Sequence, residues 1–486
     1  MFMFLAVVSA VAAAGQALEN PVVNTTQGQI QGYKVADENY YAFYGIHYAG
    51  SVSGGNRFKV APPPPTYTGV FVAVNNEVIC AQPTSRGLIG VEDCLTLNIF
   101  TPNLTASQPV LVWIQGEEFT TSDPTIHSFK NFMNENIVVV KINYRLSIFG
   151  FLCLGVQQAP GNAGLKDVVQ GLKWVKENIA GFGGDPNNIV LFGHGSGAAM
   201  VDLITLSPMA ENLVHKAIVQ SGSALSPGAI AYDPVGYAEA LGKKLGYVDK
   251  TKEELANLLT TTDINELVSA LTAFELFNNT ALFSPCIEND VDKDNVFLKD
   301  APINILRSGN YSHVPYIAGF TDKEGTIRAY EAAYNQWLDS MEGNFEDFIQ
   351  VDLDLASTSQ ANKTALVNSI REFYFGNKTI NMEVIENYLD YHGDTMILVS
   401  IARGVRERAN TSTAEVRLYN FGYLGTYNSN WAFPEIPLTG VMHGGILNYL
   451  LNFDLKPNDV DTMQRIIQRY STFIRTGLVK LLRPDF

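Results

Sequence analysis

The 486-residue sequence has little basic charge and few cysteines. It contains 33 lysines and arginines against 49 aspartates and glutamates, which gives a formal net charge of −16 and a pI near 4.9. An acidic chain is a poor partner for nucleic acid or an anionic membrane surface, since both attract basic patches. The four cysteines are too few for a disulfide scaffold, so a hydrophobic core must supply most of the stability.

Long apolar runs are also scarce. The run Phe4–Ala14 is shorter than the ~20 residues that a membrane-spanning helix needs, and no other apolar segment approaches that length. Its length and the small residues Ala12, Ala14 and Ala17 are typical of a signal peptide, although no Lys or Arg precedes it. We therefore predict a signal peptide over residues 1–17 and a secreted, extracellular protein without a membrane span. A short membrane anchor is the alternative.

Asn-x-Ser/Thr sequons are spread widely along the chain. Any one of them can arise by chance, but their number and spacing suit a glycoprotein of the secretory route. The predicted acceptors are Asn24, Asn103, Asn278, Asn310, Asn362, Asn377 and Asn410.

Patterns of buried β-strands alternate with helical patterns through much of the chain. Apolar spacing predicts a helix between Leu165 and Ile179 that ends before the glycines of Gly181–Gly184. A last amphipathic helix is predicted over Asp461–Arg475. Strands that alternate with helices imply a largely parallel sheet covered on both faces. The predicted strands are Val110–Ile114, Ile137–Ile142, Ile189–Phe192, Ala217–Gln220, Tyr316–Gly319 and Val416–Asn420.

The sequence shows no mark of a second domain. Residues 230–300 and 325–410 are interpreted as mostly helical insertions without a core pattern of their own. There is no repeat, no low-complexity linker and no block of like charge. We therefore predict a single α/β domain over residues 18–486, which opens with alternating antiparallel strands around Gln27–Gly32.

Several segments match the motifs of one family in the family's order: Glu92–Ile99, Asn143–Leu146, Ala159–Asn162, Asn178–Asn188 and, more loosely, Thr321–Gly325 and Val441–Gly444. With these motifs the chain resembles the type-B carboxylesterase/cholinesterase family from about residue 20 to about residue 477. Members of that family usually continue somewhat further, so the C-terminus here is shorter than typical. The resemblance implies the α/β-hydrolase fold, in which a largely parallel central sheet is flanked by helices on both faces.

The resemblance also implies two structural features near the first motif. Cys80 and Cys94 are expected to form the family's short-loop disulfide, which closes about 15 residues and contributes roughly 3 kcal/mol in the chain-entropy model. Arg57 and Glu92 are expected to form a structural ion pair. Cys153 and Cys286 match no pair of the family, so free, buried thiols are favoured there over a second bridge.

The turn after the Ile189–Phe192 strand departs from the family at its most reactive residue. Ester hydrolysis on this fold needs a serine on a sharp strand-to-helix turn, Gly-x-Ser-x-Gly. Here the turn has Gly195 at the nucleophile position, after His194 in place of the family's acidic residue. Ser196 takes a position that donates its N–H to the oxyanion. A displaced nucleophile at Ser196 is disfavoured, because a shift of one residue should turn the side chain away from the cleft.

The loop that resembles the family's oxyanion loop is altered as well. The family's His-Gly-Gly-Gly-Phe corresponds to Gln115-Gly-Glu-Glu-Phe119, which places Gly116, Glu117 and Glu118 at oxyanion-hole positions together with Ser196. Two carboxylates bring negative charge toward a forming anion, and one lost donor costs about 10²–10³ in rate. The alternative is that both glutamates point to solvent on a remodelled loop.

Two members of the family's catalytic triad remain by resemblance, Glu324 as the acid and His443 as the base. Without a nucleophile they are interpreted as vestigial, because a broken triad keeps only about 10³–10⁴ over the uncatalysed rate, and only with a working oxyanion hole. The sequence thus predicts a catalytically inactive carboxylesterase-like protein. Its partner is a small hydrophobic or ester ligand in an apolar cleft, or an extracellular protein, and not nucleic acid.

A carboxylic ester hydrolase of weak or unconventional activity is the alternative function. It would use water activated by His443, or other chemistry among His194, His443 and the loop glutamates. No cofactor is predicted, and no ligand spacing specifies a metal site. Cholinesterase activity is disfavoured because the loop between Cys80 and Cys94 has no tryptophan for a quaternary ammonium cage.

Overall fold

The computed structural model describes residues 20–122, 128–274, 281–350, 358–426, 431–451 and 455–479. The predicted signal peptide, residues 1–17, and the sequon at Asn278 lie outside them.

A nine-stranded sheet runs through the centre of the molecule in the order β14-β13-β12-β11-β9-β10-β8-β4-β3. Neighbours from β14 to β10 are parallel, whereas β8, β4 and β3 add antiparallel pairs at one edge. The prediction of a largely parallel α/β sheet is confirmed, and each predicted strand lies within or overlaps an observed one. The strands are β3 (Tyr33–Lys34), β4 (Tyr41–His47), β8 (Thr96–Thr101), β9 (Gln108–Ile114), β10 (Val138–Ile142), β11 (Gly184–His194), β12 (Lys216–Gln220), β13 (Tyr316–Thr321) and β14 (Val416–Phe421).

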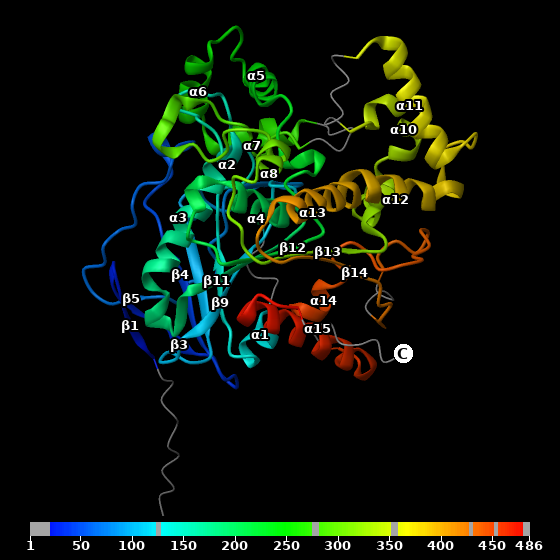
Figure 1. Ribbon diagram of the computed structural model, residues 1–486. Helices are drawn as coiled ribbons and strands as arrows, with labels where there is room; N and C mark the ends of the chain where they lie inside the picture. Colours follow the sequence, from blue (N-terminus) through cyan, green and yellow to red (C-terminus); the bar gives the residue numbers. More distant parts are fainter. Residues whose placement is uncertain are drawn as a thin grey trace, which may run out of the picture.

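Helices cover both faces of this sheet (Figure 1). Successive side chains of β9 point to opposite faces, so Val112 joins the larger hydrophobic cluster and Trp113 the smaller one. The larger cluster includes residues of α3 and α4, and the smaller one includes residues of α1, α14 and α15. Burial on both faces explains why the strands are continuous apolar runs. The bounds are α1 (Lys130–Asn134), α3 (Ala163–Asn178), α4 (Ser196–Leu206), α14 (Leu447–Leu450) and α15 (Pro457–Thr476).

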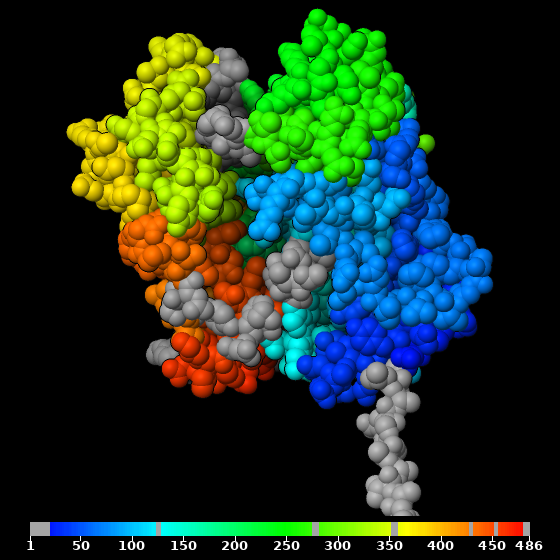
Figure 2. Space-filling view, turned by 180° about the vertical axis from the view of Figure 1, so that it is seen from behind, coloured from blue at the N-terminus to red at the C-terminus, as the bar shows by residue number. Residues whose placement is uncertain are grey.

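The two predicted insertions are helical. In the space-filling view they form separate lobes, green for the first and yellow for the second, with a notch between them (Figure 2). The second insertion packs a hydrophobic cluster of its own around buried Tyr388 and Tyr391, which the sequence pattern did not indicate. The helices are α5 (Pro234–Lys244), α6 (Lys252–Thr261) and α7 (Ile264–Thr272), then α8 (Pro302–Ser308), followed by α9 (Ala329–Tyr334), α10 (Trp337–Gly343), α11 (Gln360–Phe375), α12 (Ile385–Gly393) and α13 (Val399–Thr411).

The opening strands form a small separate sheet, and a hairpin lies beside the first disulfide. β1 (Val22–Thr25) pairs antiparallel with β2 (Gly28–Gln31), as predicted, and β5 (Phe71–Val72) adds a parallel strand. The hairpin joins β6 (Gln82–Thr84) to β7 (Gly87–Ile89). None of the described helices is long and apolar enough to span a bilayer.

Both cysteine pairs are bridged. The Cys80–Cys94 disulfide is present, but the expectation of free thiols at Cys153 and Cys286 is wrong, because these two also form a disulfide. The side-chain amide of Asn162 accepts from the backbone N–H of Cys286 and donates to its carbonyl, both at 2.8 Å, which holds the two distant segments together. A link across 133 residues is worth about 5 kcal/mol in the chain-entropy model.

The structural ion pair between Arg57 and Glu92 is confirmed. Two parallel bonds join them, Nε to Oε1 at 2.6 Å and Nη2 to Oε2 at 2.9 Å. The remaining nitrogen of Arg57 donates to the carbonyls of Leu259 and Thr262 at the end of α6. This guanidinium therefore ties the first insertion to the segment of the first disulfide.

The predicted glycosylation sites that the structure describes all lie at the surface. An acceptor asparagine must be exposed to carry a glycan. The exposed sequon residues are Asn24, Asn103, Asn310, Asn362, Asn377 and Asn410.

Candidate active site and ligand pocket

The site lies where neighbouring parallel strands end. Gly193 near the end of β11 is in register with Ile114 at the end of β9, and Gln220 of β12 is in register with Gly319 of β13. The segments that follow these strands therefore emerge at one edge of the sheet, the usual place for a ligand in open α/β folds. The Gly195 turn, the loop after β9 and the short helix η6 (Glu324–Arg328) all belong to this edge.

The turn between β11 and α4 keeps a sharp strand-to-helix geometry. Gly195 has φ +58° and ψ −124°, a region that L side chains rarely adopt and glycine adopts freely. Its N–H donates to the Gln220 carbonyl at 3.0 Å, and its own carbonyl accepts from Ala199 N–H at 3.1 Å. The backbone of a nucleophile turn is thus present with a glycine at its apex.

The space beside Gly195 is open toward His443. A Cβ atom at Gly195 would lie 3.9 Å from His443 Nε2 and 4.0 Å from the Gly116 carbonyl, and no other described atom outside the turn would lie closer than 4 Å. A side chain at this position would therefore point into the pocket and meet the imidazole.

Glu324 and His443 form the acid–base pair that the resemblance implied. Glu324 Oε2 lies 2.5 Å from His443 Nδ1, and Glu324 is fully buried. Its other oxygen accepts from the N–H of Thr321 at 2.8 Å and from the hydroxyl of Ser221 at 2.7 Å. With three partners the carboxylate is fixed, and it orients the ring so that Nε2 faces Gly195.

His194 packs against this pair. The His194 and His443 rings lie 4.6 Å apart, with a tilt of 46° between their planes. An imidazole in place of the family's acidic residue removes one negative charge from the neighbourhood of His443. Among the described residues, no group of three or more His, Cys, Asp and Glu side chains is arranged to hold a metal ion.

The loop after β9 is closed on itself. The N–H of Glu117 donates to the Thr121 carbonyl at 3.2 Å, and the Glu117 carbonyl accepts from Thr120 and Thr121 N–H at 3.0 and 3.2 Å. Glu118 and Phe119 both have left-handed torsions, with φ of +51° and +61°, so the unusual backbone survives the loss of two glycines. One predicted oxyanion donor, the N–H of Glu117, is therefore already engaged within the loop.

Ser196 lies beneath this loop. It is among the residues that line the pocket, and the expectation that its side chain turns away from the cleft stays a prediction. Its Oγ accepts a hydrogen bond from Phe119 N–H at 3.2 Å. A Cβ at Gly116 would lie 2.5 Å from that same oxygen and 2.6 Å from the backbone nitrogen of Gly197, so only glycine fits at Gly116. The hydroxyl is thus held between the helix and the loop.

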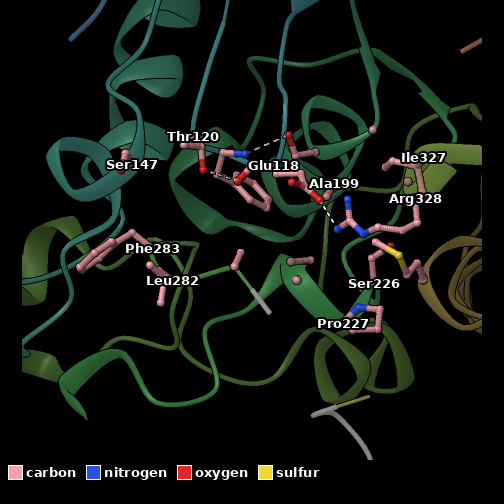
Figure 3. A pocket seen from close by; sticks show the side chains of 18 of the residues that line it. Glu118, Thr120, Ser147, Ala199, Ser226, Pro227, Leu282, Phe283, Ile327 and Arg328 are labelled. Carbon is pink, nitrogen blue, oxygen red and sulfur yellow. Dashed lines mark hydrogen bonds and ion pairs between the residues drawn. The ribbon is translucent and has the colours of Figure 1, made fainter. Parts of the chain in front are cut away.

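Glu118 is half-exposed and also has a charged partner in the cavity. Its carboxylate pairs with Arg328 of η6, and the two side chains face each other in the pocket (Figure 3). Arg328 also lies 3.6 Å from a carboxylate oxygen of Glu331 and stacks over the Trp337 ring at 5.6 Å. Burial raises the pKa of Glu331, and the positive charge of Arg328 acts against that rise. Glu117 and Glu118 are both exposed, so the alternative of two solvent-facing glutamates stays open, although the Glu118 carboxylate also pairs with Arg328.

Gly195, His443 and the pair of Glu118 and Arg328 line one cavity. Its volume of about 420 Å³ is within the range that suits a small-molecule ligand. Its wall is mostly apolar and joins the candidate site to both insertions. Among its residues are Gly195, Ser196, Glu118, Arg328 and His443, together with the apolar Leu271, Phe274, Leu282, Phe283, Ile327, Trp337 and Met396.

Sequence reasoning missed the charged groups that Glu118 meets. Arg328 and Glu331 belong to no recognised motif, and Arg328 lies 210 residues from Glu118. The one available signal is that Arg328 follows the Thr321–Gly325 motif by less than one turn of helix. A cation so close to the acid of the triad could have been expected near the same site.

Comparison with known proteins places the chain in a family. The profile described as "Carboxylesterase family" matches residues 19–481. The chain belongs to the carboxylesterase family. It is 31% identical over 484 residues to venom carboxylesterase-6 of Apis mellifera, covering 94% of this chain and 86% of that protein. It is 30% identical over 493 residues to juvenile hormone esterase of Tribolium castaneum, covering 94% and 84%.

A solved structure agrees with the fold. The crystal structure of juvenile hormone esterase from Manduca sexta, with OTFP covalently attached, superposes with a TM-score of 0.84 at 26% identity. The match covers 94% of this chain and 91% of that one. The α/β-hydrolase fold of this carboxylesterase-family protein is thereby confirmed.

Proposed function

We propose that this chain is a secreted carboxylesterase-family protein that lacks the nucleophilic serine, does not hydrolyse esters efficiently, and binds a small hydrophobic or ester-like ligand in the cavity. The observation that carries the proposal is Gly195. Covalent catalysis on this fold needs a hydroxyl at the apex of the turn, within reach of the base. Gly195 presents no side chain to His443 Nε2, although the space for one is open.

The loop after β9 supports the proposal independently. An oxyanion needs free N–H donors aimed at it, and the N–H of Glu117 is donated to the Thr121 carbonyl instead. The carboxylate of Glu118 lies in the same cavity and would repel a forming anion. A chain that regained only the serine would still have a damaged oxyanion site.

Weak ester hydrolysis is the second candidate function, and the intact pair of Glu324 and His443 favours it. His443 Nε2 would take a proton from water as the water oxygen attacks the ester carbonyl, without a covalent enzyme intermediate. The bond from the acyl carbon to the alkoxy oxygen would then break, and His443 would return the proton to the leaving alcohol. Glu324 would hold the imidazole in the orientation that accepts this proton. We expect the rate to be low for two reasons. A water molecule is not held in place as a covalently attached nucleophile is, and the Glu117 N–H that should stabilise the oxyanion donates to the Thr121 carbonyl instead.

Secretion and glycosylation belong to the same proposal. The apolar run Phe4–Ala14 supports export, as do the two disulfides, which persist in oxidising compartments. The exposure of every described sequon asparagine supports glycan attachment. An extracellular protein partner remains the alternative to a small ligand.

Turnover of a p-nitrophenyl ester by the purified secreted protein tests the catalytic half of the proposal. Venom carboxylesterase-6 serves as the hydrolysing comparison, and His443→Ala reports any rate that depends on the base. We expect a kcat/KM lower than that of the relative by about 10³ or more, since both the nucleophile and an oxyanion donor are compromised. A rate within about tenfold of the relative, abolished by His443→Ala, would contradict the proposal.

A further inference from the structure

The charged groups of the cavity differ in how much of each a ligand can reach. The Glu118 side chain is 51% exposed, whereas those of Glu331 and Arg328 are 20% and 8% exposed. Arg328 is therefore recessed behind the carboxylate that pairs with it. Although the cluster contains both signs of charge, the charge that an entering molecule meets is negative.

The net charge of the cluster also favours a cationic ligand. Glu118 and Glu331 against Arg328 leave the cluster with one excess negative charge, in a chain of net charge −16. An anionic ligand would have to displace Glu118 from Arg328 and would add to the excess. A cationic ligand would neutralise it and leave the existing pair in place.

The rest of the cavity suits an apolar tail. In the close view Leu282 and Phe283 lie on the opposite side from Glu118 and Arg328 (Figure 3). Phe274 and Leu271 also belong to the wall. An amphiphile can therefore place its head at Glu118 and bury its chain against these residues of the first insertion.

We propose that the cavity takes an amphiphilic primary amine, whose protonated nitrogen donates a hydrogen bond to the Glu118 carboxylate while its hydrocarbon chain lies among the apolar residues of the wall. The proposal rests on the ligand-binding half of the proposed function and names the chemical class of that ligand. An amine with N–H groups is preferred to a quaternary ammonium ion, because a charge-assisted hydrogen bond to a carboxylate needs a donor.

Titration calorimetry with four compounds of equal chain length tests the proposal on the natural protein. The probes are n-octylamine, octan-1-ol, octanoate and octyltrimethylammonium, all at neutral pH. We expect n-octylamine to bind about tenfold or more tightly than each of the others, the gain of one charge-assisted hydrogen bond. Octan-1-ol or octanoate binding as tightly as n-octylamine would overturn the proposal.

The variant Glu118→Gln tests whether the preference for n-octylamine depends on the Glu118 carboxylate. We expect this variant to bind n-octylamine about as weakly as octan-1-ol, and to bind octanoate better than the natural chain does, because Arg328 becomes accessible. Glu77→Gln, at an exposed residue outside the cavity wall, is the matched control and should keep the natural order of affinities. An unchanged order in Glu118→Gln would also overturn the proposal.

The outcomes separate this inference from the proposed function. If the neutral probe binds as well as the amine, the preference for a cation is wrong and binding of a hydrophobic ligand stands. If none of the octyl compounds binds, both the inference and the ligand-binding half of the proposed function fail. The ester assay decides the catalytic half in either case.

Discussion

The two sides of the candidate site differ in how much of the family's catalytic geometry they retain. On one side the buried carboxylate of Glu324 lies 2.5 Å from His443 Nδ1, which is the geometry of an acid–base pair. On the other side Gly195 offers no nucleophile, and the loop from Gly116 to Thr121 is closed by its own hydrogen bonds and by the pair between Glu118 and Arg328.

The difference follows from what each side does for the fold. The Glu324 carboxylate accepts from the N–H that ends β13 and from Ser221, so its removal would leave buried donors unpaired. Glycine at Gly195 relaxes a strained turn at no cost to packing. We infer that a chain under no demand for hydrolysis would retain the first side and lose the second.

The largest expected effect comes from Gly195→Ser. The new hydroxyl should lie near His443 Nε2, which takes its proton as the oxygen attacks a fluorophosphonate and fluoride leaves. We expect stoichiometric labelling of this variant in intact-mass spectra. Adding His443→Ala should slow labelling by about 10³-fold or more. An equal labelling rate with and without His443→Ala would show that Glu324 and His443 no longer act as an acid–base pair.

A second effect should come from opening the loop. In the Gly195→Ser background, Glu117→Gly together with Glu118→Gly restores the glycines of the oxyanion loop and removes two carboxylates from it. We expect kcat/KM for a p-nitrophenyl ester to rise by about 10²–10³ over Gly195→Ser alone, the value of one recovered donor. Equal rates in the two variants would mean that the loop does not limit catalysis.

The smallest effect concerns stability. Glu324→Ala removes an acceptor from Thr321, Ser221 and His443 at once, and we expect it to lower the free energy of unfolding by about 2–3 kcal/mol. Glu118→Gln acts at a half-exposed side chain and leaves Glu331 beside Arg328, so about 1 kcal/mol or less is expected. Urea unfolding of both variants, beside Glu77→Gln, measures the difference. Equal losses would remove the structural contrast between the two sides.

Local patterns in the sequence were sufficient for the parallel part of the central sheet. β10, β12 and β13 are buried on both faces, and such strands are short apolar runs that are visible without a structure. The motif matches placed Gly195, Glu324 and His443, and the structure brings these three together. Their relation could be predicted because each lies in a motif of its own.

Contacts between distant segments that belong to no shared family motif were beyond the sequence. The Cys153–Cys286 bridge joins positions 133 residues apart, and Asn162 holds the backbone of Cys286 beside it. The pair of Glu118 and Arg328 likewise joins the loop after β9 to the short helix η6, which no local pattern connects. Neither periodicity nor composition carries information on such pairs, so they became apparent only once the chain was folded.

The central claim is that the natural chain has no nucleophile at the turn. Incubation of the natural protein with a fluorophosphonate, followed by intact-mass and peptide mass spectrometry, tests it most directly. We expect an unchanged protein mass under conditions that label Gly195→Ser completely. An adduct on Ser196 of the natural chain would contradict it, and would show a shifted nucleophile that works from beneath the loop.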